Sequence, residues 1–209
     1  MKKRILCFGD SNTWGYIPGS AERYSEDIRW PSLLASKLGS EYQVIEEGLS
    51  GRTTLFECDY DEYLNGKKAL GFVLKSQQPL DCVVLMLGTN DLPDHHIDRV
   101  EIAITELIRN FKNANYIFRS KTPIFPNGVK LLLISPLPFG KSAALRDEIK
   151  EESKLFPEVY KRVAELCEVD YLDPTSLIEP SDVDGIHFTP EAHKALAAEV
   201  YKKLMEMNI

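Results

Sequence analysis

Apolar or β-rich stretches recur along the chain and are separated by helical patterns, at residues 5–8, 42–45, 82–87, 129–134 and 169–172. A strand with one wet face alternates apolar and polar residues, whereas a strand covered on both faces is apolar throughout. We therefore expect parallel strands whose connecting helices cover both faces of one sheet. The pattern predicts an α/β fold, a three-layer αβα sandwich with a five-stranded parallel sheet.

Apolar residues at helical spacing predict helices at residues 31–38, 97–118 and 143–167, the last interrupted near Pro157, and a final helix from Pro190. Gly39 is a good helix terminator, and Thr189 before Pro190 is a good start signal. The less regular stretches are residues 18–27, 55–65 and 120–127. Long loops of this kind often serve as lids or oligomer contacts.

The composition narrows the class of protein. The chain has 209 residues, of which 44% are hydrophobic and 27% charged, so we expect one globular domain spanning residues 1–209. A net charge of −7 without a basic cluster argues against a nucleic-acid partner. No stretch approaches the ~18 apolar residues of a membrane span, and the apolar start after Lys2-Lys3-Arg4 is too short for a signal peptide. We expect a cytoplasmic protein without membrane contact, whose four cysteines are structural.

Polar segments follow the predicted strands, at residues 9–11, 48–52, 88–91 and 184–187. The carboxyl ends of parallel strands meet at one edge of the sheet, where ligands bind. We therefore expect these four segments to converge there. This convergence carries more weight than any single motif.

Ser11, Asp184 and His187 are the candidate catalytic residues. A serine hydroxyl becomes a nucleophile when a histidine takes its proton, and a carboxylate must orient that histidine. Gly185 permits the backbone to curl so that Asp184 meets the ring of His187. The alternative for this segment alone is a turn before a helix, with His187 on the surface.

Acyl transfer also requires donors aimed at the developing oxyanion. Gly51 offers a backbone N–H without a Cβ in the way, Asn90 offers a side-chain N–H, and Ser11 offers its own backbone N–H. Taken alone, residues 48–51 could be an ordinary turn and residues 88–91 an ordinary strand end. Their combination with the other two segments favours an oxyanion hole formed by Ser11, Gly51 and Asn90.

These motifs resemble those of the SGNH (GDSL-type) hydrolase superfamily, namely FGDSNTWG at 8–15, EGLSGR at 47–52, GTND at 88–91 and DGIH at 184–187. The resemblance implies a flavodoxin-like fold, Ser11 as the nucleophile, Asp184 and His187 as its partners, and no metal or cofactor. The first motif reads GDSN rather than GDSL, which removes no catalytic group. Residues 29–30, 44–54, 64–66, 86–91 and 183–189 further resemble the arylesterase/acyltransferase branch.

That branch implies a serine esterase acting on carboxylic esters of small alcohols, with acyltransfer as an added activity of some members. Its best-studied member has alanine where this chain has Gly51 and an apolar residue where it has Asn12. The alternative substrates within the superfamily are acetylated carbohydrates, lysophospholipids and thioesters. Asn12, Trp14 and Ile186 are candidate substrate-binding residues because they neighbour catalytic residues in the sequence.

Other interpretations of the sequence remain open. The resemblance implies a homo-oligomer, for which apolar loops at residues 17–18 and 124–126 are candidate contacts. His95 and His96 lie near acidic residues, but adjacent histidines point apart, so a solvated helix start is favoured over a metal site. We expect His193 on the surface and Arg52 either against a substrate or packed between loops. A non-catalytic binding protein with the same fold is the alternative to an enzyme.

Overall fold

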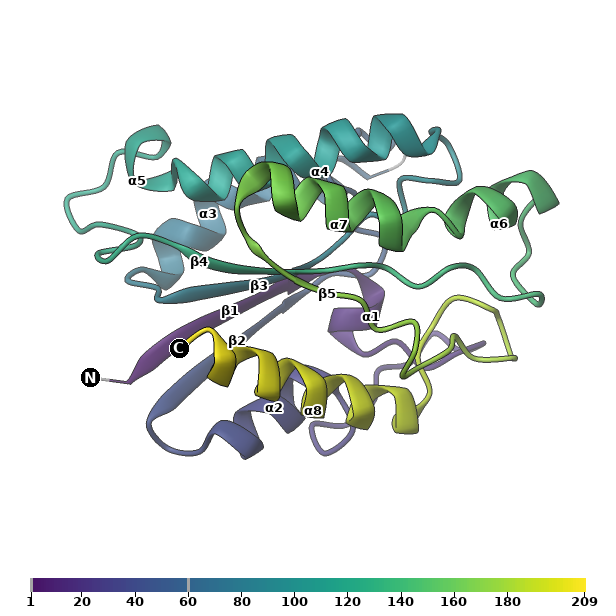
Figure 1. Ribbon diagram of the computed structural model, residues 1–209, viewed down its shortest axis with the longest axis horizontal. Helices are drawn as coiled ribbons and strands as arrows, with labels where there is room; N and C mark the ends of the chain where they lie inside the picture. The colour runs from purple at the N-terminus through teal and green to yellow at the C-terminus, as the bar shows by residue number, and fades with distance from the viewer. Residues whose placement is uncertain (1, 60) are drawn as a thin grey trace.

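A parallel five-stranded sheet forms the centre of the protein (Figure 1), whose computed structural model describes residues 2–59 and 61–209. Its strands are β1 (Lys3–Gly9), β2 (Tyr42–Gly48), β3 (Cys82–Met86), β4 (Lys130–Ile134) and β5 (Asp170–Leu172). They lie in the order β2-β1-β3-β4-β5, with every neighbouring pair parallel. The order reverses at β1, and the crevice beyond the carboxyl ends at such a point is the usual ligand site of this architecture.

Helices cover both faces of the sheet, as the continuous apolar strands predict. The helices are α1 (Ser11–Trp14), α2 (Trp30–Leu38), α3 (Gly66–Gln77), α4 (Ile97–Lys112), α5 (Ala114–Ile117), α6 (Asp147–Ser153), α7 (Phe156–Cys167) and α8 (Pro190–Glu206), with a 3₁₀ turn, η1 (Glu62–Leu64). Helices α2 and α8 lie on one face, and α3, α4 and α7 on the other (Figure 1). The predicted three-layer αβα fold is therefore confirmed.

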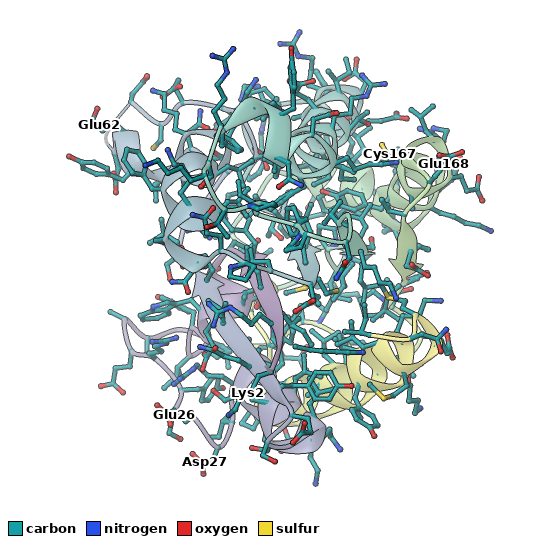
Figure 2. All side chains as sticks on the ribbon, turned by 90° about the vertical axis from the view of Figure 1, so that its left-hand side faces the viewer. Lys2, Glu26, Asp27, Glu62, Cys167 and Glu168 are labelled. Atoms are coloured by element: carbon teal, nitrogen blue, oxygen red, sulfur yellow. The ribbon has the colours of Figure 1, made fainter. Side chains whose placement is uncertain are left out.

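Alternate residues of β1 supply the two cores. Ile5 and Cys7 pack with α2 and α8, whereas Leu6 and Phe8 pack with α3, α4 and α7, and all four are fully buried. Charged side chains are exposed on the outside of the molecule. The labelled side chains of Glu26, Asp27 and Glu62, for example, project away from the ribbon (Figure 2). Within the described residues, no helix is both long and apolar enough to cross a membrane.

The structure refines three of the expected elements. The helix expected at 97–118 ends as α4 at Lys112, and α5 continues the chain after Asn113. The interruption expected near Pro157 falls at residues 154–155 instead. Pro157 lies in the first turn of α7, where the backbone N–H that proline lacks would have no partner within the helix. Helix α3 was not predicted, since Gly66, Gly71 and the exposed Phe72 obscure its apolar stripe.

Two expectations about the surface are wrong. Ile124 and Phe125 are buried in the core that includes α4, so they are not available as oligomer contacts. His193 is fully buried, because its position on α8 faces α2 rather than solvent, and its Nδ1 atom accepts a hydrogen bond from the Trp30 N–H at 3.3 Å. Burial, together with the nearby Arg29, lowers the pKa of His193 to about 4.

Candidate active site

The four polar segments converge at the carboxyl edge of the sheet. Ser11 begins α1 directly after β1, Gly51 follows β2, and Asn90 follows β3. The loop before α8 brings His187 to Ser11 from a position 176 residues further along the chain. The expected convergence is thus a property of the fold.

The start of α1 places Ser11 at a helix N-terminus. Asp10 caps the helix, since its Oδ1 accepts a hydrogen bond from the Asn12 N–H at 3.0 Å. A Cβ at Gly9 would overlap the Thr13 side chain and lie 2.6 Å from the Met86 carbonyl oxygen, so only glycine fits where the strand turns into the helix. The partial positive charge of a helix N-terminus favours a nearby anion, which suits an oxyanion beside the Ser11 N–H.

Ser11, His187 and Asp184 form one hydrogen-bonded chain. The Ser11 Oγ lies 3.0 Å from His187 Nε2, and His187 Nδ1 lies 2.8 Å from Asp184 Oδ2. The second oxygen of Asp184 accepts the backbone N–H groups of Ile186 and His187, each at 3.0 Å. Gly185 makes the curl with a φ of 69°, as expected from the sequence. The three candidate catalytic side chains are therefore in contact.

Asp184 is held in its charged form. Burial alone would raise its pKa, but hydrogen bonds from the backbone and ring of His187 and from Ile186 lower the pKa below the ordinary value. The Gly19 N–H adds a hydrogen bond to Asp184 Oδ2 at 3.2 Å. An ionised Asp184 fixes the proton of the neutral imidazole on Nδ1, which leaves Nε2 to accept the serine proton.

An aromatic ring that the sequence analysis did not identify covers the base. Tyr16 stacks on His187 with ring centroids 4.2 Å apart and planes inclined by 30°. The segment after α1 also bridges Tyr16 to Arg23, and the guanidinium of Arg23 lies 5.1 Å from the centroid of Trp14. Trp14 therefore has one face occupied by Arg23. No sequence motif marks Tyr16, because its partner comes from the far end of the chain.

Gly51 and Asn90 follow β2 and β3, the two strands that flank β1 and its nucleophile in the sheet. Gly51 has a φ of 81°, a conformation that favours glycine, and a Cβ there would lie 3.2 Å from the Leu64 side chain. Asn90 donates one Nδ2 hydrogen to the Arg52 carbonyl at 2.9 Å. This bond fixes the amide plane of Asn90 and leaves its second Nδ2 hydrogen for another acceptor.

Arg52 packs between loops, which decides between the two roles considered for it. Its buried guanidinium donates to the Gly9 carbonyl at 3.1 Å and to the backbone carbonyl and carboxylate of Glu47, and it stacks 4.2 Å from the centroid of Phe8. These contacts join the ends of β1 and β2 beneath the site. They leave Arg52 without a face toward a substrate.

Two buried carboxylates support the site from below. Asp91 accepts hydrogen bonds from the N–H and Oγ1 of Thr54, at 2.9 and 3.0 Å, and so ties the segment after β2 to the segment after β3. Burial raises the pKa of Asp91 to about 7, against the hydrogen bonds from Thr54, and the nearby Asp10 raises it further. Burial likewise raises the pKa of Asp10 to about 6.

The three candidate substrate-binding residues differ in their surroundings. Asn12 is 5% exposed, and its amide bonds the backbone on both sides of His187, so the structure does not place it against a substrate. Ile186 is half-buried and packs on the core that contains Phe8. Trp14 and Ile186 remain candidates for contact with a substrate.

A hollow of about 490 Å³ opens beside the oxyanion donors. Its lining includes both Gly51 and Asn90 and combines polar with apolar groups. The remaining lining residues are Thr53, Phe56, Glu57, Cys58, Asp59, Pro93, Asp94 and His95. The rings of Phe56 and His95 stack with centroids 3.7 Å apart and form an aromatic wall.

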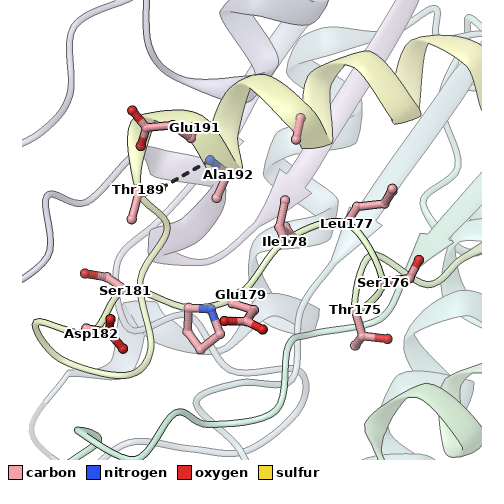
Figure 3. A pocket seen from close by; sticks show the side chains of 12 residues that line it. Thr175, Ser176, Leu177, Ile178, Glu179, Ser181, Asp182, Thr189, Glu191 and Ala192 are labelled. Carbon is pink, nitrogen blue, oxygen red and sulfur yellow. Dashed lines mark hydrogen bonds between the residues drawn. The ribbon is translucent and has the colours of Figure 1, made fainter.

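A second hollow, of about 540 Å³, lies between residues 175–182 and the start of α8 (Figure 3). Thr189 caps α8 there by accepting a hydrogen bond from the Ala192 N–H at 3.2 Å, as expected. This hollow includes none of the triad or oxyanion residues. The hollow beside Gly51 and Asn90 is therefore the better candidate of the two for the substrate.

His95 and His96 have separate surroundings. His95 stacks on Phe56, whereas His96 is exposed at the start of α4 and lies 3.4 Å from Glu152. Apart from residues 1 and 60, which are not described, the chain has no group of three or more histidine, cysteine, aspartate or glutamate residues arranged to hold a metal ion. The solvated helix start is the better description of His96.

Comparison with known proteins places this geometry in a family. Residues 7–195 match the GDSL-like lipase/acylhydrolase family. The structure of an aryl esterase from M. smegmatis is 32% identical, with 98% of this chain and 99% of that chain covered and a TM-score of 0.89. Est24, a carbohydrate acetylesterase from Sinorhizobium meliloti, is also 32% identical, with 99% and 100% covered and a TM-score of 0.90.

A more distant structure, of an acetyl-xylooligosaccharide esterase from Geobacillus stearothermophilus (Axe2), is 19% identical with a TM-score of 0.62 and supports the fold alone. A search of the curated proteins found no significant match. The family match and the two esterase structures cover nearly the whole chain. The chain therefore belongs to the GDSL-like lipase/acylhydrolase family of the SGNH superfamily, and it is a carboxylic ester hydrolase.

Proposed function

We propose that the protein is a serine esterase that hydrolyses carboxylic esters of small alcohols through an acyl-enzyme on Ser11. The observation that carries this proposal is the hydrogen-bonded chain from Ser11 through His187 to Asp184, with distances of 3.0 and 2.8 Å. Nucleophile, base and orienting acid are thus in reach of one another without rearrangement.

Acylation follows from this geometry. His187 Nε2 takes the proton of Ser11 as Oγ attacks the ester carbonyl, and Asp184 stabilises the imidazolium that forms. The imidazolium then donates its proton to the departing alkoxide, which leaves as the alcohol. Water enters, gives a proton to His187 and attacks the acyl carbon, so that Ser11 is released with its proton restored.

The oxyanion is stabilised by donors that three strand ends supply. We assign the backbone N–H groups of Ser11 and Gly51 and the remaining Nδ2 hydrogen of Asn90 to this role. Their support is rigid, because Asn90 is tied to Arg52 at 2.9 Å and Asp91 is tied to Thr54. Donors that need no reorganisation during the reaction provide the largest catalytic effect.

Acetylated carbohydrates are the second candidate substrate. The hollow beside Gly51 and Asn90 combines polar and apolar groups along its lining and has an aromatic wall formed by Phe56 and His95. Such a surface suits the hydroxyl groups and apolar faces of a sugar better than a long acyl chain. The 32% identity to Est24, a carbohydrate acetylesterase, supports the same choice.

The test compares wild type and Ser11→Ala on p-nitrophenyl acetate, butyrate and octanoate, and on acetylated oligosaccharides. We expect hydrolysis that falls with acyl length and disappears in the variant. Ser36→Ala, on the outer face of α2, is the matched control and should leave the rate unchanged. Hydrolysis that persists in folded Ser11→Ala would refute the assignment of the nucleophile.

Acyltransfer and self-association are further proposals for this chain. Both rest mainly on the resemblance to the arylesterase/acyltransferase branch, and exposed Phe72 and Tyr116 offer apolar surface for association. Addition of an alcohol during ester hydrolysis should yield the new ester if acyltransfer operates. Light scattering that gives a clean monomer would reject self-association.

A further inference from the structure

Asn12 connects the segment that carries the nucleophile to the loop that carries the base. Its Nδ2 donates a hydrogen bond to the Ile186 carbonyl at 3.2 Å, and its Oδ1 accepts one from the Phe188 N–H at 3.1 Å. These two backbone groups lie directly before and directly after His187. One amide therefore brackets the catalytic histidine.

The orientation of this amide is determined by its partners. A backbone N–H can only donate and a carbonyl can only accept, so the oxygen of Asn12 must face Phe188 and its nitrogen must face Ile186. The residue is 5% exposed, and its own N–H is used by the cap at Asp10. Asn12 thus has little surface or bonding capacity left for a substrate.

Other contacts of the catalytic loop act on the His187 ring, lie within the loop, or hold residues before His187. Tyr16 stacks on the His187 ring, and the Ser181 N–H bonds the His187 carbonyl from within the loop. The Gly19 N–H bonds Asp184, and the Gly140 N–H bonds the Gly185 carbonyl at 2.8 Å. Both lie on the amino-terminal side of His187. The hydrogen bonds between Asp184 and His187 lie within the loop, so they move with it and do not fix its distance from Ser11.

We infer that Asn12 is a positioning residue, whose side-chain amide holds His187 within proton-transfer distance of Ser11. The inference rests on the proposed serine esterase function and deepens it. Ser11 and Asn12 are consecutive in α1, so the nucleophile and the tie to the base share one rigid turn. A GDSN sequence then specifies a hydrogen-bonded connection that the more common GDSL sequence does not contain.

The test replaces Asn12 with leucine, which branches at the same carbon with the same number of side-chain heavy atoms and makes neither hydrogen bond. A base displaced by about 1 Å commonly costs about 10²-fold in rate, so we expect kcat to fall by about that factor. KM should stay within about twofold, because the substrate pocket is untouched. The rate at which a phosphonate inactivates Ser11 should fall by the same factor as kcat, since it depends on the same pair of atoms.

Asn110→Leu is the matched control. Asn110 is also a buried asparagine, whose Nδ2 donates to the Glu106 carbonyl at 2.7 Å, but it lies on α4 away from the site. We expect Asn110→Leu to lower the unfolding temperature and leave kcat unchanged. The control separates the loss of a buried amide from the loss of the tie to His187.

The kcat and KM of folded Asn12→Leu test the positioning role of Asn12. A kcat that stays at the wild-type level in folded Asn12→Leu, or a KM that rises while kcat stays constant, would overturn the inference. If Asn12→Leu does not fold, Asn12→Asp keeps the shape and loses the donor to Ile186, and it is judged by the same split between kcat and KM. Failure of the proposed function is a separate result, in which wild type hydrolyses no ester and Ser11 is not labelled.

Discussion

Asn12 and Asn90 are both amides within the active site, but they use their bonding atoms in different ways. The buried Asn12 bonds the backbone of the catalytic loop through both its Nδ2 and its Oδ1, whereas Asn90 is only half-buried and bonds the Arg52 carbonyl through Nδ2, which leaves one hydrogen directed elsewhere. A residue whose polar atoms are all paired can position a neighbour. A residue with a fixed and unpaired donor can stabilise charge that develops during a reaction.

Substitution of Asn90 by alanine should therefore lower kcat far more than it raises KM. Loss of one oxyanion donor typically costs about 10²–10³ in kcat, because the charge that it stabilises exists only in the transition state. Steady-state kinetics with p-nitrophenyl acetate measure this loss. Asn90→Asp, which keeps the shape and lacks the donor, should match the alanine variant, and near-normal turnover in folded protein would exclude Asn90 from the oxyanion hole.

At this scale the sequence predicts the triad and not its supports. Asp184 and His187 lie three residues apart, and the curl at Gly185 needs only local backbone geometry, so their contact is foreseeable. Asn12 bonds residues 174 and 176 positions away, and Tyr16 stacks on His187 by the same closure of the chain. Contacts that depend on the three-dimensional path of the backbone leave no local sequence signal.

At the scale of elements, the loops after β2 and β3 behave as one unit. Asp91 accepts two hydrogen bonds from Thr54, and Asn90 bonds Arg52, so the segments that carry Gly51 and Asn90 are tied at two places. Burial raises the pKa of Asp91 from 3.8 to about 7. The folded protein therefore binds a proton at Asp91 over a range of pH in which the unfolded chain has released it.

Protonation of Asp91 makes the free energy of unfolding depend on pH. The contribution of Asp91 to the free energy of unfolding is full below pH 3.8 and declines as pH rises toward about 7. The Asp91→Asn variant lacks this decline. The free energy of unfolding of Asp91→Asn minus that of wild type should therefore increase as pH rises from 3.8 to about 7, by at most ~1.4 kcal/mol per unit of pH. Urea unfolding at several pH values measures the difference.

The control for this series is Asp98→Asn, in the exposed first turn of α4. It removes a carboxylate of the same kind from the surface and should keep the wild-type dependence on pH. A constant stability difference between Asp91→Asn and wild type across the series would show that Asp91 is ionised in the folded protein as readily as in the unfolded chain.

Element boundaries follow from the sequence wherever burial decides them. The strands β1, β3 and β4 were predicted because a strand covered on both faces is apolar throughout, and the edge strands β2 and β5 were predicted from shorter β-rich runs. Thr189 with Pro190 marks the start of α8. Helix α3 was not predicted, because two glycines and an exposed phenylalanine weaken its apolar stripe, and Asn65 supplies its cap. Tertiary packing rather than local preference stabilises that helix.

At the scale of the whole molecule, charge should select among substrates. The net charge is −7, and the hollow beside Gly51 and Asn90 is lined by Glu57, Asp59 and Asp94. Esters whose acyl chain ends in a carboxylate should have a kcat/KM roughly tenfold below that of neutral esters of equal length. The negative potential of the acidic lining lowers the local concentration of an anionic substrate.

Salt and substitution test the cause of this selectivity. Raising the ionic strength screens surface charges and should narrow the gap between the neutral and anionic esters. Asp94→Asn should narrow it as well, whereas Asp27→Asn, which lines a different hollow between α2 and α8, should not change it. Equal rates for both esters at low salt would mean that the acyl chain does not enter this hollow.

The order of the chain has a consequence for how activity arises during folding. The base and its acid are followed at once by α8, which packs beside α2 on the face of β1 opposite α4, and Trp30 of α2 bonds His193 of α8. A partly folded chain with β1, β2 and β3 in place would hold the nucleophile and the oxyanion donors and still be inert. On dilution from denaturant, the return of esterase activity should therefore require the docking of α8, and catalysis itself becomes a reporter of that contact.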